Sequence, residues 1–364
     1  MPIDLKEDKT LAGRPRLKAT CIKLHDIAQE LGPDAKLPTI AELKTSLGVS
    51  VYTLNDAVRE LERRQILRSV NGVGIYVTPR KRTWTGNIGI VGNASLSSPQ
   101  LEYYHLLMRG IQEQTQLHRQ HLLFLGPAGS WDSRSLEKVD GLLAICIDNA
   151  RDFVKIIPPS MPAVTVFTAA ENYSSVTVDD RQGARLAVEY LLERGHRRIA
   201  CLAEEAPLLS HLRVQGYHDA LHAAGIKAPA EWIRLTPLAQ SLEYNEQAYL
   251  HWGRVQMEQW LKEGWRETGC TALFVQNDTA AIGVMNYLRD AGIKVPEEIS
   301  IIGFDGTTLC DYVSPRLTSV KIPLMEIGSK AMELLNAQIA QNHTIETNVM
   351  PLRIREGESI AHLS

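Results

Sequence analysis

Apolar residues near the N-terminus recur with the period of an α-helix. One helical stripe runs through residues 24–31 and another through residues 51–61, and a short helix between them begins after Thr39. Thr39 and Glu42 have the spacing of a capping box. Two apolar runs around Asn71–Gly72 then predict a β-hairpin. Helix, helix, turn, helix and hairpin in this order predict a winged helix-turn-helix.

Beyond this head, the pattern changes to apolar strands that alternate with amphipathic helices almost to the C-terminus. Such alternation predicts parallel sheets with helices on both faces. About 275 residues exceed a comfortable single core, so we expect an α/β core of two lobes, each a doubly wound parallel sheet. The predicted strands are Ile88–Gly92, Leu122–Leu125, Leu142–Ile147, Ala163–Phe167, Ser175–Val178, Ile199–Ala203, Ala272–Gln276 and Ile299–Phe304.

These patterns divide the chain into four segments. We expect a basic flexible tail over 1–20, the winged helix-turn-helix over 21–78, a linker over 79–86 and the core over 87–364. Within the core we expect one lobe from about 87–170 with 304–322, and the other from 171–303 with 323–364.

Charge separates the head from the core, although the net charge of the whole chain is only −3. Residues 1–86 carry 15 Lys and Arg against 10 Asp and Glu, whereas the rest carries 24 against 32. A basic head predicts a polyanionic partner. No apolar run is long enough to cross a membrane or to serve as a secretory signal, and five scattered cysteines fit a reducing cytoplasm. A membrane protein and a disulfide-stabilised secreted protein are therefore excluded.

The run from Leu37 to Val77 resembles a GntR-type winged helix. The resemblance rests on Leu37-Pro38, Glu42-Leu43, Leu47-Gly48-Val49-Ser50, Thr53, Ala57-Val58, Leu61-Glu62 and Gly72-Val73-Gly74-Ile75-Tyr76-Val77. A recognition helix offers its first turns to base edges, and its later arginines to phosphates. The residues expected to contact DNA are Thr39, Ser50, Val51, Tyr52, Thr53, Asn55, Arg59, Arg64, Gly72 and Gly74.

Two of these positions depart from the GntR pattern. Where that pattern has arginine and a second basic residue, this chain has Val51 and Asn55. Readout of guanine by arginine is therefore missing at two expected places. Asn55 has the chemistry to pair with adenine, and Val51 to touch a thymine methyl group.

Residues 87–364 are similar to the LacI/GalR effector core, which shares its fold with periplasmic sugar-binding proteins. The motifs that carry the resemblance are Val178-Asp179-Asp180, Gly195-His196-Arg197-Arg198-Ile199, Arg213 with Gly216-Tyr217, Asn277-Asp278, Ile299 through Asp305, and Ser314 through Val320. A GntR-type head on such a core is the arrangement of arabinose-repressor-type regulators.

This resemblance implies an effector site between the lobes, at the carboxyl ends of the strands. Arg213 matches the effector-binding arginine of the family, Asn277 its asparagine and Asp305 its ligand-binding aspartate. Phe167 and Tyr103 are the expected aromatic contacts, and Asn93 and Ser95 are further candidates. Aspartate, arginine and asparagine together suit a polyhydroxylated ligand.

The sequence thus predicts a cytoplasmic, homodimeric transcription regulator that binds double-stranded operator DNA. A small effector, with a mono- or oligosaccharide favoured, would control that binding. The alternative is a sugar sensor whose head contacts protein instead of DNA, which the departures at Val51 and Asn55 keep open. We expect no enzymatic activity, because the pattern places one carboxylate in the cleft, and we expect no cofactor, metal or membrane partner.

Overall fold

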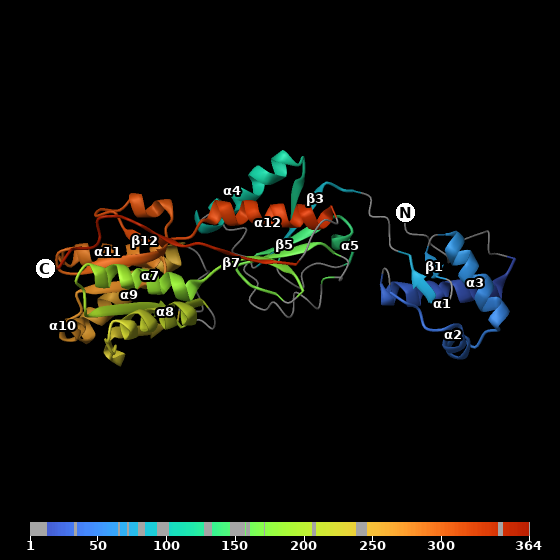
Figure 1. The fold of residues 1–364 in the computed structure, drawn as a ribbon, viewed down its shortest axis with the longest axis horizontal. Coiled ribbons are helices and arrows are strands. Elements are labelled where there is room, and N and C mark those ends of the chain that lie inside the picture. Colours follow the sequence, from blue (N-terminus) through green and yellow to red (C-terminus); the bar gives the residue numbers. More distant parts are fainter. Residues whose placement is uncertain are drawn as a thin grey trace. The chain divides into compact units, whose positions relative to one another are not determined.

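The computed structural model describes residues 13–32, 35–64, 66–70, 73–78, 84–92, 102–126, 133–145, 157, 161–170, 172–205, 209–237, 246–340 and 345–363 (Figure 1). The chain divides into two compact units, the head up to Trp84 and the core from Thr85 onward. Each unit is described by itself.

The head is a winged helix-turn-helix, as the hydrophobic pattern predicts. Its elements are α1 (Pro15–Leu31), α2 (Ile40–Leu47), α3 (Val51–Arg63), β1 (Leu67–Val70) and β2 (Gly74–Val77), with β1 and β2 antiparallel. The capping box is present, because the Thr39 hydroxyl accepts the Glu42 N–H and the Glu42 carboxylate accepts the Thr39 N–H. Leu24, Leu54 and Leu61 lie at the centre of the core that unites the three helices.

The expected boundaries of the tail and of the linker need correction. Helix α1 already begins at Pro15, because proline has a fixed backbone angle that suits the first helical turn, so 15–20 are not tail. At the other boundary, the Thr85 and Gly86 N–H groups donate to the carboxylate of Asp140, which fixes them to the core. Residues 1–12 and 79–83 lie outside the described part of the chain.

The first lobe of the core is built on a parallel six-stranded sheet. The strand order is β13-β7-β6-β5-β3-β4, with β3 (Asn87–Gly92), β4 (His121–Gly126), β5 (Gly141–Ile145), β6 (Ala163–Val166), β7 (Ser174–Val178) and β13 (Thr347–Met350). Helices α4 (Glu102–Leu117) and α12 (Leu324–Ile339) pack against each other (Figure 1) and against this sheet. A short helix, α5 (Ser133–Leu136), lies between β4 and β5.

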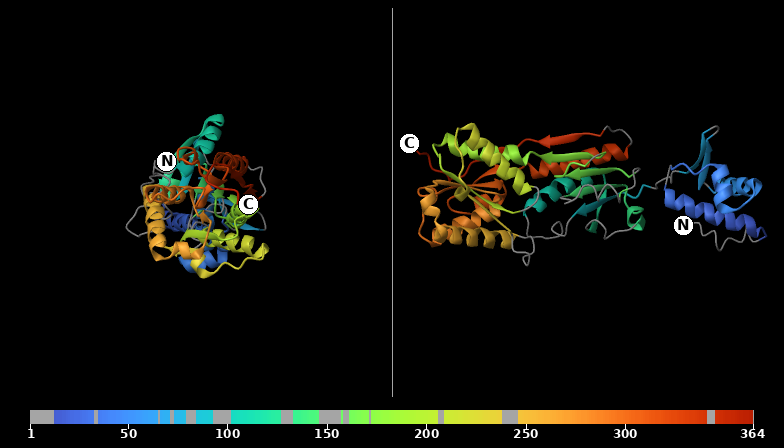
Figure 2. Two further views of the ribbon diagram at one scale, coloured as in Figure 1. Left: turned by 90° about the vertical axis from the view of Figure 1, so that its left-hand side faces the viewer. Right: turned by 90° about the horizontal axis from the view of Figure 1, so that it is seen from below.

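The second lobe has a six-stranded sheet with helices on both faces (Figure 2). The strand order is β14-β12-β11-β10-β8-β9, with β8 (Ile199–Glu204), β9 (Ile233–Thr236), β10 (Ala272–Val275), β11 (Ser300–Asp305), β12 (Thr318–Lys321) and β14 (Arg353–Arg355). β14 alone runs antiparallel. Helices α7 (Asp180–Glu193) and α8 (Leu209–Ala223) cover one face, and α9 (Glu246–Glu263) and α11 (Asp278–Asp290) cover the other. The short helices η3 (Ala230–Trp232), α10 (Trp265–Thr268) and η4 (Thr308–Asp311) join these elements.

The α/β fold class and the two-lobed architecture are confirmed, but the expected lobe boundaries are wrong. Strand β7 pairs with β6 and so belongs to the first lobe. Strand β12 pairs in parallel with β11 and belongs to the second lobe, whereas α12 packs on α4 of the first. The chain therefore crosses between the lobes after β7, after β12 and again between β13 and β14. Within the described ranges, no helix is both long and apolar enough to span a bilayer.

Candidate DNA-binding and effector-binding sites

The recognition helix α3 presents an apolar first turn to solvent. Ser50 caps the helix by accepting the Thr53 N–H at 3.1 Å, and the two hydroxyls lie 2.8 Å apart. Between them, Tyr52 is 76% exposed and Val51 is 42% exposed. Asn55 is exposed one turn further along the helix. The side chains free to meet a base edge are therefore Val51, Tyr52 and Asn55.

The two predicted phosphate-binding arginines of the head differ in their surroundings. Arg59 is exposed. The Arg64 side chain is only 11% exposed and its Nε lies 2.6 Å from Glu60 Oε1, which also pairs with Arg63 at 2.7 Å. Hydrogen bonds from Arg63 and Arg64 hold the pKa of Glu60 below its usual range. Arg64 is thus engaged within the head, whereas Arg59 points to solvent.

In the wing, Gly74 has a positive φ of 143°, which a residue with a side chain rarely adopts. A Cβ atom there would lie 2.7 Å from the Lys36 side chain. Gly72 lies outside the described residues. Contact with DNA remains a prediction for every one of the head residues.

In the core, Arg213 lies at the centre of a buried polar cluster in the second lobe. Its Nε donates to Asp180 Oδ1 at 2.8 Å, its Nη1 donates to the Gln276 carbonyl and lies 3.7 Å from Asp305 Oδ1. The guanidinium carbon lies 3.7 Å from the centre of the Phe304 ring, so the group is stacked on an aromatic face. Burial by itself lowers the pKa of Arg213, but Asp180 and Asp305 outweigh that effect and raise it.

Asp305, the second carboxylate beside this arginine, has a strained backbone. Asp305 has a positive φ of 114°, at the end of β11. Burial raises the pKa of Asp305 well above its usual range, and nearby Asp278 and Asp180 add to the effect although Arg213 opposes it. Backbone strain of this kind occurs often at functional sites. Asp305 therefore combines a strained backbone with a buried carboxyl group beside Arg213.

Asp278 lies beside this cluster and holds the turn that follows β11. It accepts hydrogen bonds from the Thr307 N–H at 2.8 Å, from the Ser319 hydroxyl and from the Cys310 thiol at 3.2 Å. These bonds fix the turn after β11. Burial raises the pKa of Asp278, while the hydrogen bonds from Ser319 and Thr307 act in the opposite direction.

The first lobe supplies an aromatic wall. The ring of Tyr103 lies 5.4 Å from that of Phe167, and it also packs edge-on against Tyr104 at 5.4 Å. Phe167 has a positive φ of 67°, directly after β6. The expected residues thus form two pairs, Tyr103 with Phe167 in the first lobe and Arg213 with Asp305 in the second.

Other expected site residues are placed differently. The Asn277 carboxamide oxygen caps α11 by accepting the Ala280 N–H at 2.8 Å, which leaves its NH₂ group for other partners. Asn93 and Ser95 lie outside the described residues. Sequence reasoning missed Asp180 and Asp278, because an acid in the first turn of a helix is also what the helix dipole favours. One carboxylate was expected in this region, and the structure places both Asp180 and Asp305 beside Arg213.

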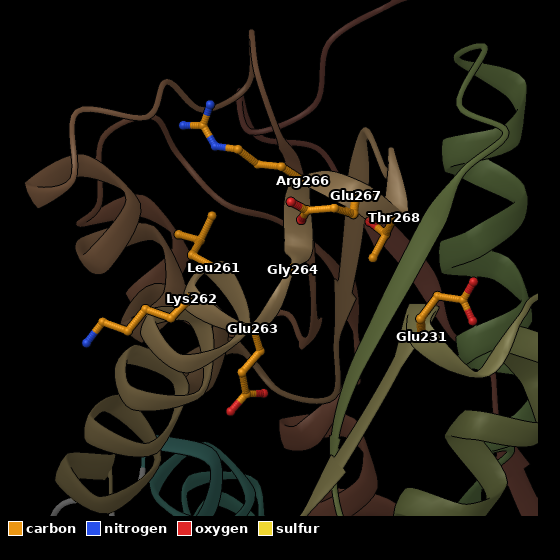
Figure 3. A pocket seen from close by; sticks show the side chains of 8 residues that line it. All are labelled: Glu231, Leu261, Lys262, Glu263, Gly264, Arg266, Glu267 and Thr268. Atoms are coloured by element: carbon orange, nitrogen blue, oxygen red, sulfur yellow. The ribbon is translucent and has the colours of Figure 1, made fainter.

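Surface hollows also lie away from this cluster. One of about 510 Å³ is lined by Glu231 and by residues 261–264 and 266–268 at the end of α9 and in α10. Figure 3 shows its charged side chains pointing in different directions and not toward a common centre. A second, of about 240 Å³, is lined by residues of α9, α11 and the turn around Tyr312.

Comparison with known proteins now places the chain. The model of the periplasmic binding protein-like domain matches residues 188–360, and that of the bacterial regulatory proteins of the gntR family matches residues 24–77. The ribose operon repressor of Escherichia coli K12 is 30% identical over 275 residues, 72% of this chain and 78% of that protein. The transcriptional repressor CytR of the same strain is 29% identical over 305 residues, 79% of this chain and 84% of that protein.

A solved structure agrees. The LacI family transcriptional regulator from Enterococcus faecium, with bound ribose, superposes with a TM-score of 0.64 at 25% identity and covers 76% of this chain and 100% of that one. The chain belongs to the LacI family of transcriptional regulators. As a LacI-family protein it is a DNA-binding regulator of transcription with an effector-binding core, and its head is of the GntR type.

Proposed function

We propose that this LacI-family regulator binds a neutral mono- or oligosaccharide at the Arg213 cluster and that the sugar controls its affinity for operator DNA. The observation that carries the proposal is the buried pairing of Arg213 with Asp305 in the second lobe, and the packed rings of Tyr103 and Phe167 in the first lobe support it. A carboxylate accepts hydrogen bonds from two hydroxyls, and a guanidinium donates as a planar fork. Aromatic rings pack against the apolar C–H face of a sugar.

Relatives support a sugar as the effector class. One relative is named for the ribose operon, and the Enterococcus regulator was solved with ribose bound. A pentose is therefore the first ligand to test, followed by hexoses, disaccharides and nucleosides.

The head supports double-stranded operator DNA as the macromolecular partner. Its exposed first turn of α3 has the length and position of a major-groove reader. The rival reading is a head that contacts protein, and it is favoured by the exposed Tyr52 and Val51. Binding to DNA with sequence preference separates the two.

We further propose that the protein is a homodimer. Two winged helices on a two-fold axis would read a palindromic operator. Tyr312 is 82% exposed and Leu250 is 38% exposed beside the 240 Å³ hollow on α9 and α11. We propose this face, which lies on the second lobe, as part of the contact between two copies.

The test of the effector site is calorimetric titration of the protein with D-ribose and the wider sugar panel. Wild type is expected to bind one of these sugars, and Arg213→Ala to weaken that binding at least about tenfold, since hydrogen bonds to charged groups contribute about 1.5–3 kcal/mol. Arg234→Ala is the matched control, because Arg234 is also a little-exposed, ion-paired arginine of the same lobe, bound to Glu263. Equal affinity in Arg213→Ala and wild type would refute the site.

A further inference from the structure

Glu102 connects the two lobes. It is the first residue of α4, in the first lobe. Its Oε1 accepts the Thr308 N–H at 3.2 Å and the Thr308 hydroxyl, and its Oε2 accepts the Leu309 N–H at 3.1 Å. Thr308 and Leu309 begin η4, in the second lobe. One carboxylate therefore takes three hydrogen bonds across the boundary between the lobes.

The segment that Glu102 holds is continuous with the effector cluster. Asp305 ends β11, and the Thr307 N–H, two residues later, donates to the buried Asp278. Thr308 and Leu309 follow at once. The turn is thus held by Asp278 of the second lobe and by Glu102 of the first lobe, and it begins at Asp305.

On the other side, Glu102 is continuous with the aromatic wall. Tyr103, the next residue of α4, packs on Phe167. The same helical turn therefore carries both the connection to η4 and a ring of the aromatic wall. A lobe that moved away would break the Glu102 bonds and carry Tyr103 with it.

We propose that Glu102 is a positioning residue for the effector: its carboxylate latches α4 to η4 and stabilises the arrangement in which Tyr103 and Asp305 face one ligand. The inference rests on the proposed effector site and assigns its regulation. Hydrogen bonds to a carboxylate are about twice as strong as neutral ones, so the latch biases the lobes toward the closed, ligand-binding arrangement. Because the latch holds the arrangement that surrounds the ligand, its loss speeds effector dissociation.

A simpler role must be separated from this one. An acidic residue in the first turn of a helix also stabilises that helix through the helix dipole. Such a role would lower the stability of α4 without any dependence on Thr308. A double-mutant cycle of Glu102→Ala and Thr308→Val distinguishes the two, because only the latch couples these residues.

The experiment uses the full chain and D-ribose, or the panel sugar that wild type binds most tightly. Glu102→Ala is expected to raise the effector dissociation rate about tenfold, the equivalent of about 1.4 kcal/mol, and Glu102→Gln, which keeps one acceptor oxygen, to give an intermediate value. Thr308→Val is expected to add nothing in the Glu102→Ala background. Glu113→Ala, on the exposed face of the same helix, is the control and is expected to match wild type.

Amide hydrogen exchange of the unliganded protein tests the latch without any sugar. Glu102→Ala is expected to raise exchange at Thr308 and Leu309, and Glu113→Ala is not. Unchanged exchange at both amides, or an unchanged dissociation rate with additive effects in the cycle, would overturn the proposal. If wild type binds no sugar while the exchange at Thr308 and Leu309 responds, the proposed effector is wrong and the latch between the lobes stands.

Discussion

At the scale of single residues, the buried carboxyl group of Asp305 is expected to lower the stability of the fold while it binds the effector. Its pKa is raised, so the fold disfavours the charged form, and its contribution to stability is present below the ordinary pKa of aspartate and is lost as pH rises through the raised value. Asp305→Asn is expected to raise the Tm of the free protein at neutral pH by about 2 °C or more, because a neutral group replaces a buried third carboxyl.

The same substitution is expected to weaken sugar binding, since an NH₂ donor replaces one of the two acceptor oxygens of the carboxylate. Scanning calorimetry at pH 7, paired with titration of the sugar, measures both effects. A variant that loses stability and keeps its affinity would show that Asp305 has a structural role instead.

Arg59 of the recognition helix and Arg64 at its C-terminal end give a second prediction at this scale. Each phosphate contact adds about 0.9 to the slope of log affinity against log salt. Arg59→Ala is expected to reduce that slope by about 0.9, because Arg59 is exposed, whereas Arg64→Ala is expected to leave it nearly unchanged, because Glu60 holds Arg64. Fluorescence anisotropy with a DNA duplex over a salt series measures both slopes, and equal slopes for the two variants would contradict the assignment.

Residue types and motifs predicted part of the effector cluster. Arg213, Asp305, Phe167 and Tyr103 came from the family resemblance, and the structure pairs Arg213 with Asp305 and Tyr103 with Phe167. Asp180 was missed because an acidic residue is common in the first turn of any helix. Only its 2.8 Å hydrogen bond from Arg213 shows that it belongs to the cluster. Such contacts join residues distant in sequence and leave no local signal.

At the scale of elements, close helix packing depends on small residues. A Cβ atom on Gly110 of α4 would lie 2.0 Å from the Met325 carbonyl oxygen, and one on Gly328 of α12 would lie 2.3 Å from the Leu107 carbonyl oxygen. Backbone atoms give way less easily than side chains. The two helices therefore approach as they do because glycine stands at both contacts.

Gly110→Ala is accordingly expected to destabilise the core by about 1–3 kcal/mol, the usual cost of overpacking. Thermal unfolding monitored by circular dichroism measures the change, with Glu113→Ala of the same helix as the control. Since alanine favours helices over glycine, a more stable Gly110→Ala variant would show that α4 and α12 do not pack so closely.

The elements with a strong hydrophobic period were predicted from sequence. All eight expected strands are present, with boundaries shifted by at most two residues. The strands β9, β12, β13 and β14 were not predicted, because they have three or four residues each and three of them, β9, β13 and β14, lie at sheet edges with partly exposed side chains. Whether so short a segment forms a strand depends on the strands beside it and not on its own hydrophobic pattern.

At the scale of the whole molecule, the assignment of segments to lobes could not be predicted from the sequence. Strand β12 and helix α12 are neighbours in the chain, yet β12 pairs with β11 and α12 packs on α4. Both choices depend on pairings between distant segments. Three segments of chain therefore connect the two lobes. Glu102 adds hydrogen bonds between the lobes near the proposed effector cluster.

The central claim is that a sugar bound in the core changes the affinity of the head for DNA. The most direct test is fluorescence anisotropy of DNA from upstream of the protein's own gene, at physiological salt and with unlabelled competitor DNA, with and without the sugar. The account predicts competitor-resistant binding by wild type and a shift in affinity of about 5- to 150-fold with sugar, which Arg213→Ala loses. Sequence-specific binding that no sugar in the panel alters would contradict it.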